Sequence, residues 1–244
     1  MGKRTTQQAR GKGSMTFRVR PKAYIYRISY PNLNVCGLAK INRLFNSSAH
    51  SSPLIEIEIS NDTTKNQKNR FIIPAAEGIY EGQEVYIGKR PDNASPKIGD
   101  ILRIKDINVG AKVFNIELVP GKGGKLMRAG GSSAIISAND NGNVELQIKR
   151  RKIKLNENCR AIIGTAAGNG RLIKPLVKAG KHFYIMKAIG RKWHRTSAVK
   201  RNAVDHPFGS GRGKRIKSKI AKRNAPPGAR VGHIRPRKTG RKKI

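Results

Sequence analysis

Acidic residues are scarce in this chain of 244 residues, in which 14 Asp and Glu stand against 52 Lys and Arg. The formal net charge of +38 is far above the charge of roughly 2 to 8 that is usual for a soluble domain. Self-repulsion of this size opposes compaction unless a polyanion neutralises it. We therefore expect the partner to be a nucleic acid, whose phosphates would take up the excess charge.

Cysteines and long apolar runs are also rare. Cys36 and Cys159 are the only cysteines and form no Cys-x-x-Cys pair, which argues against a disulfide framework and a zinc site. We expect both to be small buried side chains in a protein of the reducing cytosol. No apolar run reaches the about 18 residues that span a bilayer, and no apolar block follows the basic start at residues 1–8. Neither membrane attachment nor a secretory signal is expected.

Short runs of β-branched residues begin near residue 28. In residues 54–59 the isoleucines at 55, 57 and 59 alternate with Glu56 and Glu58, which is the period of a half-buried strand. Similar runs predict about five strands in this part, and such a set without a helical period suggests a small barrel of the oligonucleotide-binding type. The further expected strands are residues 35–45, 70–73, 84–87 and 101–104.

A second group of short strands follows residue 108. Residues 144–149 alternate strictly, and the Asn-Asp-Asn-Gly-Asn stretch at 139–143 before them is a strong hairpin signal. We interpret this group as a second small barrel with an SH3-like architecture, so the predicted fold class is all-β. The remaining expected strands are residues 113–119, 134–138, 152–155 and 161–164.

A glycine-rich loop with lysines occupies residues 120–131. It is not a nucleotide-binding P-loop, because Leu126 stands where a Ser or Thr would hold Mg²⁺ and a strand, not a helix, follows. We expect a flexible loop that brings Lys122, Lys125 and Arg128 close to a phosphate chain, with a plain surface loop as the alternative.

Both ends of the chain are basic and poor in core residues. Residues 1–27 contain eight basic residues and no acid, and residues 184–244 contain 20 Lys or Arg and one acid, Asp205. Low hydrophobicity with high charge predicts segments that are disordered alone and become ordered on a partner. Glycines and prolines favour an extended path in the second segment, with at most two helical turns at residues 216–223.

Several motifs resemble the family of large ribosomal subunit protein two. They are Gly-Arg-Lys-Trp at 190–193, Asn-Ala-Val-Asp-His-Pro-Phe-Gly at 202–209, Asn-Ala-Pro-Pro-Gly at 224–228 and Pro-Gly-Lys-Gly-Gly-Lys at 120–125. The likeness covers nearly the whole chain, and Ala-Ala-Glu-Gly at 75–78 resembles the archaeal and eukaryotic branch. Residues 194–201 and 210–214 depart from the family pattern.

The resemblance implies a structural constituent of the large ribosomal subunit in the cytoplasm. It implies a basic N-terminal extension (1–27), an oligonucleotide-binding domain (28–107), an SH3-like domain (108–183) and a basic C-terminal extension (184–244). The partners would be large-subunit rRNA, neighbouring large-subunit proteins and the small-subunit interface, with no membrane and no homo-oligomer. No cofactor is expected, apart from Mg²⁺ or K⁺ associated with RNA.

The segment at 202–209 would approach the peptidyl-transferase region and support tRNA placement and subunit association. Its expected RNA-binding residues are Asn202, Val204, Asp205, His206, Pro207, Phe208 and Gly209. The other expected RNA-binding residues are Arg4, Arg10, Lys12, Arg18, Lys122, Lys125, Arg128, Arg171, Lys178, Lys181, Arg191, Lys192, Trp193, His194, Arg195, Arg201, Arg223, Asn224, Arg230, His233, Arg237 and Arg241.

Asp205 beside His206 also raises the hypothesis of an RNA-modifying or RNA-cleaving enzyme, since a histidine near a carboxylate can act as a general base. Neighbouring side chains of an extended chain point to opposite sides, so Asp205 is poorly placed to orient the imidazole. We therefore expect no catalytic residue and no metal site, and a hydrogen bond or stacking contact of His206 with RNA. A basic chromatin protein is the remaining alternative. Trp193, His194 and Phe208 are candidate stacking groups, although Trp193 could instead anchor the C-terminal segment to the second barrel.

Overall fold

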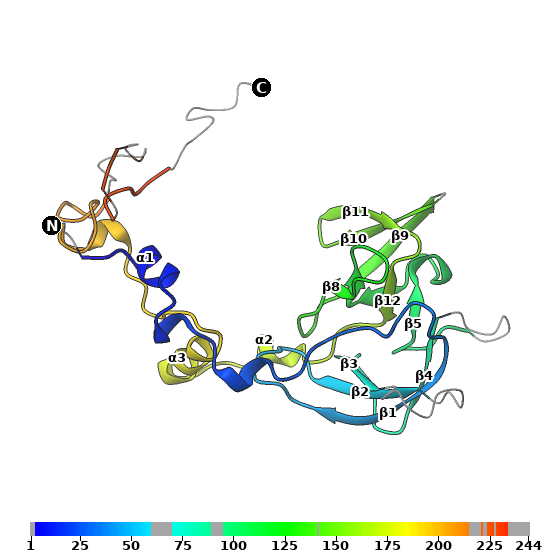
Figure 1. Ribbon diagram of the computed structural model, residues 1–244. Helices are drawn as coiled ribbons and strands as arrows, with labels where there is room; N and C mark the ends of the chain where they lie inside the picture. The colour runs from blue at the N-terminus through cyan, green and yellow to red at the C-terminus, as the bar shows by residue number, and fades with distance from the viewer. Residues whose placement is uncertain are drawn as a thin grey trace. The chain divides into compact units, whose positions relative to one another are not determined.

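The computed structural model describes residues 3–59, 70–88, 95–140, 142–214, 221, 224–226 and 228–233. The chain divides into two units (Figure 1). We call residues 21–177 the barrel unit, and residues 1–20 together with 178–244 the arm unit.

Ten strands of the barrel unit form one hydrogen-bonded sheet, in the order β11-β10-β9-β6-β12-β5-β4-β1-β2-β3. In its first half β1 pairs antiparallel with β2 and β4, and β2 pairs with β3. The predicted alternation is confirmed in β2, where Ile55, Ile57 and Ile59 are buried and Glu56 and Glu58 are only partly so. The strands are β1 (Gly37–Phe45), β2 (Leu54–Ile59), β3 (Arg70–Pro74), β4 (Glu84–Ile87) and β5 (Ile101–Arg103).

The second half has its own buried cluster, built around Val113, Ile136, Val144 and Leu146. Strand β12 pairs with both β5 and β6 and so joins the two halves. The strands are β6 (Lys112–Phe114), β7 (Ile116–Glu117), β8 (Gly124–Leu126), β9 (Ala134–Asp140), β10 (Asn143–Ile148), β11 (Arg151–Asn156) and β12 (Arg160–Ile163), with the 3-10 turn η3 (Ile104–Asp106) before β6. The all-β class is confirmed, with an oligonucleotide-binding barrel followed by an SH3-like barrel.

Three local expectations were wrong. Residues 113–119 are not one strand, because Asn115 has a left-handed φ of 49° and its N–H donates to the Met127 carbonyl, 3.1 Å away. Residues 120–131 are not all loop, since β8 pairs with β7. Cys36 is exposed, and only Cys159 is buried.

The extended path expected for residues 184–244 was wrong at its start, where a helix continues to Ala188, and the N-terminal segment also contains a helix. Helix α1 (Thr6–Gly11) forms although its first turn has no acid, because Thr5 and Gln8 make a capping box. Helix α3 (Ala179–Ala188) lies at the start of the C-terminal segment. The expected helical turns at 216–223 fall almost entirely outside the described residues. The shorter helical elements are η1 (Met15–Phe17), η2 (Pro21–Tyr24), α2 (Gly170–Ile173) and η4 (Ala198–Lys200).

Within the described part of the chain, no helix is both long and apolar enough to cross a membrane.

Candidate nucleic-acid interface

The end of helix α3 forms the joint between the two chain ends. The N–H of Arg191 donates to the Met186 carbonyl at 2.8 Å, and the N–H of Gly190 donates to the Lys187 carbonyl at 3.2 Å. With Gly190 at a φ of 66°, this is a Schellman motif, which ends a helix on a left-handed residue. The motif turns the chain directly into the basic segment that follows.

The N-terminal segment packs on this glycine. A Cβ at Gly190 would lie 3.0 Å from the Phe17 carbonyl oxygen and 3.2 Å from the backbone of Arg18. A side chain would therefore crowd the backbone of the N-terminal segment, which would have to shift. Gly190 thus serves both the helix end and the close approach of the two segments, which run side by side in the arm unit (Figure 1).

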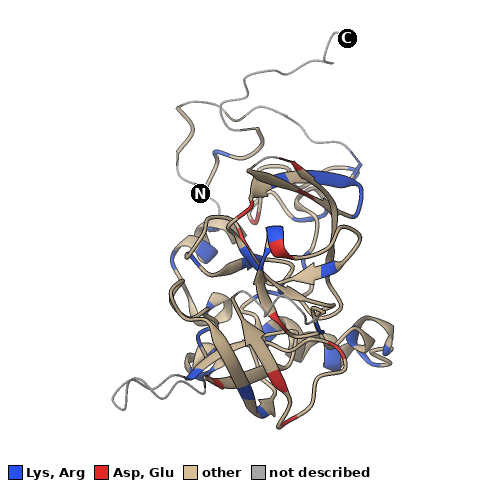
Figure 2. Cartoon of the chain, turned by 90° about the vertical axis from the view of Figure 1, so that its right-hand side faces the viewer, with Lys and Arg blue, Asp and Glu red and all other residues tan. Residues whose placement is uncertain are grey.

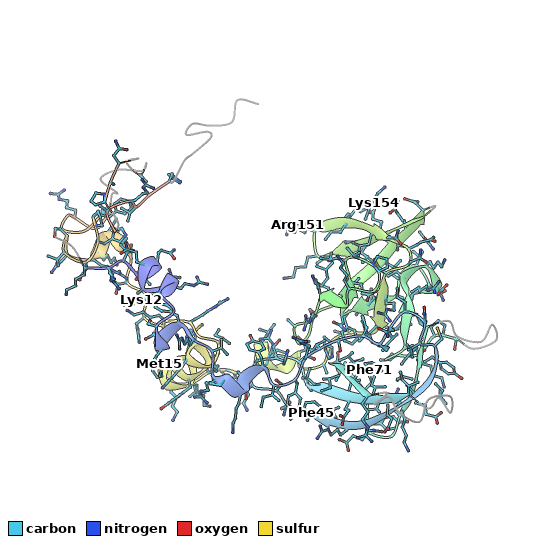
Figure 3. The ribbon with its side chains drawn as sticks, viewed as in Figure 1. Lys12, Met15, Phe45, Phe71, Arg151 and Lys154 are labelled. Atoms are coloured by element: carbon cyan, nitrogen blue, oxygen red, sulfur yellow. The ribbon has the colours of Figure 1, made fainter. Side chains whose placement is uncertain are left out.

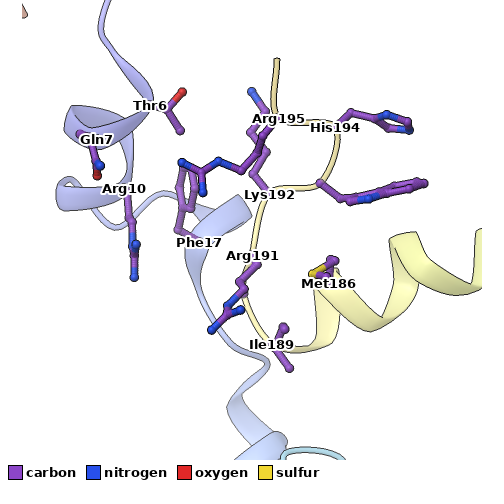
Figure 4. Close-up of a pocket in the computed structure, with 12 residues that line it drawn as sticks. Thr6, Gln7, Arg10, Phe17, Met186, Ile189, Arg191, Lys192, His194 and Arg195 are labelled. Carbon is purple, nitrogen blue, oxygen red and sulfur yellow. The ribbon is translucent and has the colours of Figure 1, made fainter. Parts of the chain in front are cut away.

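A pocket of about 650 Å³ opens where these two segments meet. Figure 4 shows that α1 and η1 supply one part of its lining and that α3 and the segment after it supply the other. Basic, aromatic, aliphatic and neutral polar side chains line it together, without a carboxylate. The lining residues are Thr6, Gln7, Arg10, Phe17, Met186, Ile189, Gly190, Arg191, Lys192, Trp193, His194 and Arg195.

Three aromatic rings pack against one another in tilted arrangements, and two of them, Trp193 and His194, line this pocket. The Trp193 ring centroid lies 3.9 Å from that of His194 and 4.8 Å from that of His182 on α3. Both ring partners of Trp193 belong to the arm unit. Trp193 therefore holds the basic segment against α3.

A second cavity of about 710 Å³ lies in the same unit. It brings Arg4, Arg201 and Asn202 together, and it shares four lining residues with the first cavity: Thr6, Phe17, Lys192 and His194. Residues that the sequence suggested separately thus meet around two neighbouring hollows, because both chain ends contribute to each.

The segment at 202–210 is a closed loop. The N–H of Ser210 donates to the Arg201 carbonyl at 2.9 Å, and the Ser210 hydroxyl accepts from the N–H of Ala203 at 2.8 Å. Gly209 is buried at this closure, and a Cβ on it would lie 2.2 Å from the Arg201 carbonyl oxygen. Only glycine fits there, since the neighbour is backbone.

Asp205 and His206 use different partners. The Asp205 carboxylate pairs with the Lys3 ammonium at 3.4 Å, and the Lys3 N–H donates to the Val204 carbonyl at 2.8 Å. The Nδ1 of His206 accepts from the Phe208 N–H at 3.2 Å, and the His206 and Phe208 rings are 4.9 Å apart. Burial, with a smaller effect of Arg201, lowers the pKa of His206.

The hydrogen bond from Phe208 fixes the tautomer of His206. A neutral imidazole whose Nδ1 accepts must carry its proton on Nε2. Both the bond and the lowered pKa favour this neutral form. His206 therefore offers an N–H donor at Nε2 and has no free lone pair with which to act as a base.

In the barrel unit, a buried carboxylate accepts hydrogen bonds from the backbone of the glycine-rich loop. The Glu117 side chain accepts from the N–H of Gly121 at 3.3 Å and of Gly123 at 3.0 Å. Lys122 and Lys125 stay exposed, and a guanidinium nitrogen of Arg128 donates to the Gly124 carbonyl at 3.3 Å. The loop is thus fixed to the barrel while its lysines face solvent.

Most of the remaining predicted residues lie on the surface. Asn202, Val204 and Pro207 are exposed, and Asp205, His206, Phe208 and Arg201 are partly buried. Arg223, Arg237 and Arg241 lie outside the described residues. The other exposed ones are Arg4, Arg10, Lys12, Arg18, Arg171, Lys178, Lys181, Arg191, Lys192, His194, Arg195, Asn224, Arg230 and His233.

Two features were missed by sequence reasoning. Phe17, Thr6 and Gln7 line the arm-unit pocket, but nothing in their local sequence announces it. The turn between β10 and β11 carries adjoining basic residues, and Figure 3 shows the Arg151 and Lys154 side chains projecting from β11. The five Lys and Arg residues between positions 149 and 154 could have signalled this surface. Basic residues outnumber acidic ones over the ribbon in general (Figure 2).

Among the described residues no group of three or more His, Cys, Asp or Glu side chains is arranged to hold a metal ion.

Comparisons with known proteins agree on one family. The family model described as Ribosomal Proteins L2, C-terminal domain, matches residues 97–228. The large ribosomal subunit protein uL2 of Hyperthermus butylicus is 42% identical over 100% of both chains. The uL2 protein of Korarchaeum cryptofilum is 39% identical over 100% of this chain and 97% of its own length. The uL2 protein of Ignicoccus hospitalis is 41% identical over 99% of this chain and 95% of its own length. The chain belongs to the ribosomal protein L2 family.

Proposed function

We propose that this protein is a structural constituent of the large ribosomal subunit that binds its rRNA. The observation that carries this proposal is the charge of the arm unit, in which 28 Lys or Arg accompany a single acid, Asp205. That acid is itself paired with Lys3. Such a surface needs many phosphates to neutralise it, and the relatives are named as large-subunit proteins.

The two barrels would dock on the rRNA by shape, and both chain ends would enter RNA crevices. In this proposal the two predicted barrels, at 28–107 and 108–183, dock on the rRNA surface. The two predicted extensions, at 1–27 and 184–244, enter the RNA. Neighbouring large-subunit proteins and the small-subunit interface are further partners, and RNA-associated Mg²⁺ or K⁺ would supply additional neutralisation. The protein would work in the ribosomes of the cytoplasm.

The loop at 202–210 is the part proposed to reach the peptidyl-transferase region. Its backbone hydrogen bonds and the packed Gly209 give it a defined shape, and the partly buried His206 carries an Nε2–H donor. A fixed donor suits recognition of an RNA oxygen or ring nitrogen. The loop would thereby support the RNA of the active region and tRNA placement.

The geometry of His206 favours this structural role over an enzyme. A general base needs a free lone pair at the reacting nitrogen and a group that orients the ring. Here the lone pair of His206 Nδ1 accepts a hydrogen bond from the Phe208 N–H, and the Asp205 carboxylate is paired with Lys3 instead of with the imidazole. We propose that the protein itself performs no chemistry.

Binding over a salt series tests the function and both rivals. We expect tight binding to large-subunit rRNA whose logarithm falls by about 0.7 to 0.9 per phosphate contact for each log unit of salt. Equal affinity for duplex DNA would favour a chromatin protein. Multiple turnover on free RNA that His206→Ala abolishes would favour an enzyme, and a shallow salt slope would contradict the proposal.

A further inference from the structure

The pocket between the two chain ends combines features that a phosphate-neutralising surface does not need. Arg10, Arg191, Lys192 and Arg195 bring four positive side chains to it. Their charge would suffice to hold a phosphate chain on an open, flat surface. Instead they surround a hollow of about 650 Å³, within the range of roughly 300 to 1,000 Å³ that is typical of small-ligand pockets.

The hollow also has walls suited to a flat ring. Phe17 supplies an aromatic ring, Met186 and Ile189 supply aliphatic surface, and Phe17 is held in place because its own backbone packs on Gly190. Trp193 also lines the hollow, with its ring packed against those of His182 and His194. Aromatic and guanidinium planes are the groups on which unpaired RNA bases stack. The walls therefore match a base rather than a phosphate.

Neutral polar groups complete the lining. The Thr6 hydroxyl and the Gln7 amide can both donate and accept hydrogen bonds, as the edge of a base requires. A duplex presents its bases only in grooves, whereas a hollow of this size admits a base that has left its stack.

We propose that this pocket holds one unpaired nucleotide of the RNA, with its base against Phe17, close to Trp193, and its phosphates on the surrounding arginines. The inference rests on the proposed function, since it assumes that RNA is the partner. It adds that the arm unit selects a single extruded base, and that neither chain end forms the site without the other.

Trp193 is the only tryptophan and reports on the pocket directly. The full chain is titrated with a short single-stranded RNA and with an abasic ribose-phosphate chain of the same length. We expect both to bind through their charge and only the RNA to quench Trp193 fluorescence. Equal quenching by the abasic chain overturns the proposal.

Variants at Phe17 test the stacking wall. Phe17→Ala should weaken binding of the single-stranded RNA about 5- to 150-fold and leave the abasic chain unaffected, as expected for a lost stacking contact. Met15→Ala is the matched control, since Met15 lies in the same 3-10 turn and is 86% exposed. It should bind both chains as the unchanged protein does.

Conservative variants keep the test decisive if Phe17→Ala unfolds the joint. Phe17→Tyr retains an aromatic face and should bind the RNA normally, whereas Phe17→Leu retains only bulk and should bind it more weakly. Similar affinity of the two variants overturns the proposal. Failure of the unchanged protein to bind large-subunit rRNA at all would instead overturn the proposed function, so the two failures are distinct.

Discussion

The Glu117 carboxylate and the Arg160 guanidinium form an ion pair with 3.0 Å between Oε1 and Nη2, and their side chains are 0% and 5% exposed. Arg160 also donates to the Pro31 carbonyl at 2.8 Å, and its guanidinium lies 5.0 Å from the Tyr30 ring centroid. Since Glu117 also accepts hydrogen bonds from the glycine-rich loop, this pair ties three segments of the barrel unit together.

Burial around this pair also affects neighbouring ionisable groups. Burial raises the pKa of Tyr30 well above its ordinary value, and burial together with the charge of Glu117 raises the pKa of Cys159 to about 11.

Removing one partner of this pair should be costly. Glu117→Gln or Arg160→Met leaves the other charge buried and unpaired, which lowers the free energy of unfolding by about 3 to 5 kcal/mol. Denaturant unfolding of the full chain measures it. Lys105→Gln, which breaks the more exposed pair between Lys105 and Glu157 at 3.3 Å, is the control and should cost less than about 1 kcal/mol. A loss of unfolding free energy in Glu117→Gln that is no larger than the loss in Lys105→Gln would contradict the role assigned to Glu117.

Gly190 should be indispensable for joining the two chain ends. Gly190→Ala places a side chain at a left-handed φ and against the backbone of Phe17, so the N-terminal segment must move away. We expect faster tryptic cleavage after Arg18 in the full chain. Gly180→Ala is the control, because Gly180 lies in α3 with no atom within 4 Å of the added Cβ. Gly180→Ala should leave the rate of cleavage after Arg18 unchanged. If the two substitutions changed this rate equally, Gly190 would not be what joins the two chain ends.

Gly209 should be required for the closed loop. Gly209→Ala puts a Cβ into contact with the Arg201 carbonyl, which breaks the bond that this oxygen accepts from Ser210. The cost of such overpacking is typically about 1 to 3 kcal/mol. Amide hydrogen exchange should show the Ser210 N–H opening faster. Gly211→Ala, where the added Cβ meets nothing within 4 Å, should not change it. Unaltered exchange in Gly209→Ala would show that the loop is not closed by this packing.

The loop should loosen in acid because of His206. Burial and Arg201 lower the pKa of its imidazole from the ordinary 6.5, so the unfolded loop binds a proton more readily than the folded one. The stabilising contribution is complete above pH 6.5 and is lost as the pH falls through the lower folded value. NMR of the ring nitrogens should show a neutral ring protonated at Nε2 near pH 7. His206→Asn keeps an acceptor for the Phe208 N–H without titrating, so this pH dependence should disappear in it. A folded pKa above 6.5 would contradict the assignment.

The sequence predicted the barrel unit well because its signal is local. The alternation of Ile55, Ile57 and Ile59 with glutamates defines which face is buried, whatever the rest of the chain does. Asn115 was missed because its left-handed conformation depends on contacts with Met127 and with Gly124, whose Cβ would lie 2.2 Å from the Asn115 carbonyl oxygen. No propensity of a single residue encodes such a contact.

The site was predictable in its chemistry and not in its assembly. Charge density indicated a phosphate partner, and Arg10, Trp193 and His206 were named from sequence. Arg10 and Trp193 line one pocket because the backbone of Phe17 packs closely on Gly190. This is a contact between segments at opposite ends of the chain, and local sequence does not encode it. Thr5 and Gln8 could have revealed α1, since a capping box is a local signal.

Limited proteolysis of the full chain, free and assembled with large ribosomal subunits, is the decisive measurement for the proposal that RNA covers the arm unit. We expect co-sedimentation with the subunits and protection of residues 1–20 and 178–244 there alone, because buried phosphates would cover the exposed lysines and arginines. Absence of the chain from the sedimented subunits, or cleavage of the arm unit at the same rate in both states, would contradict it.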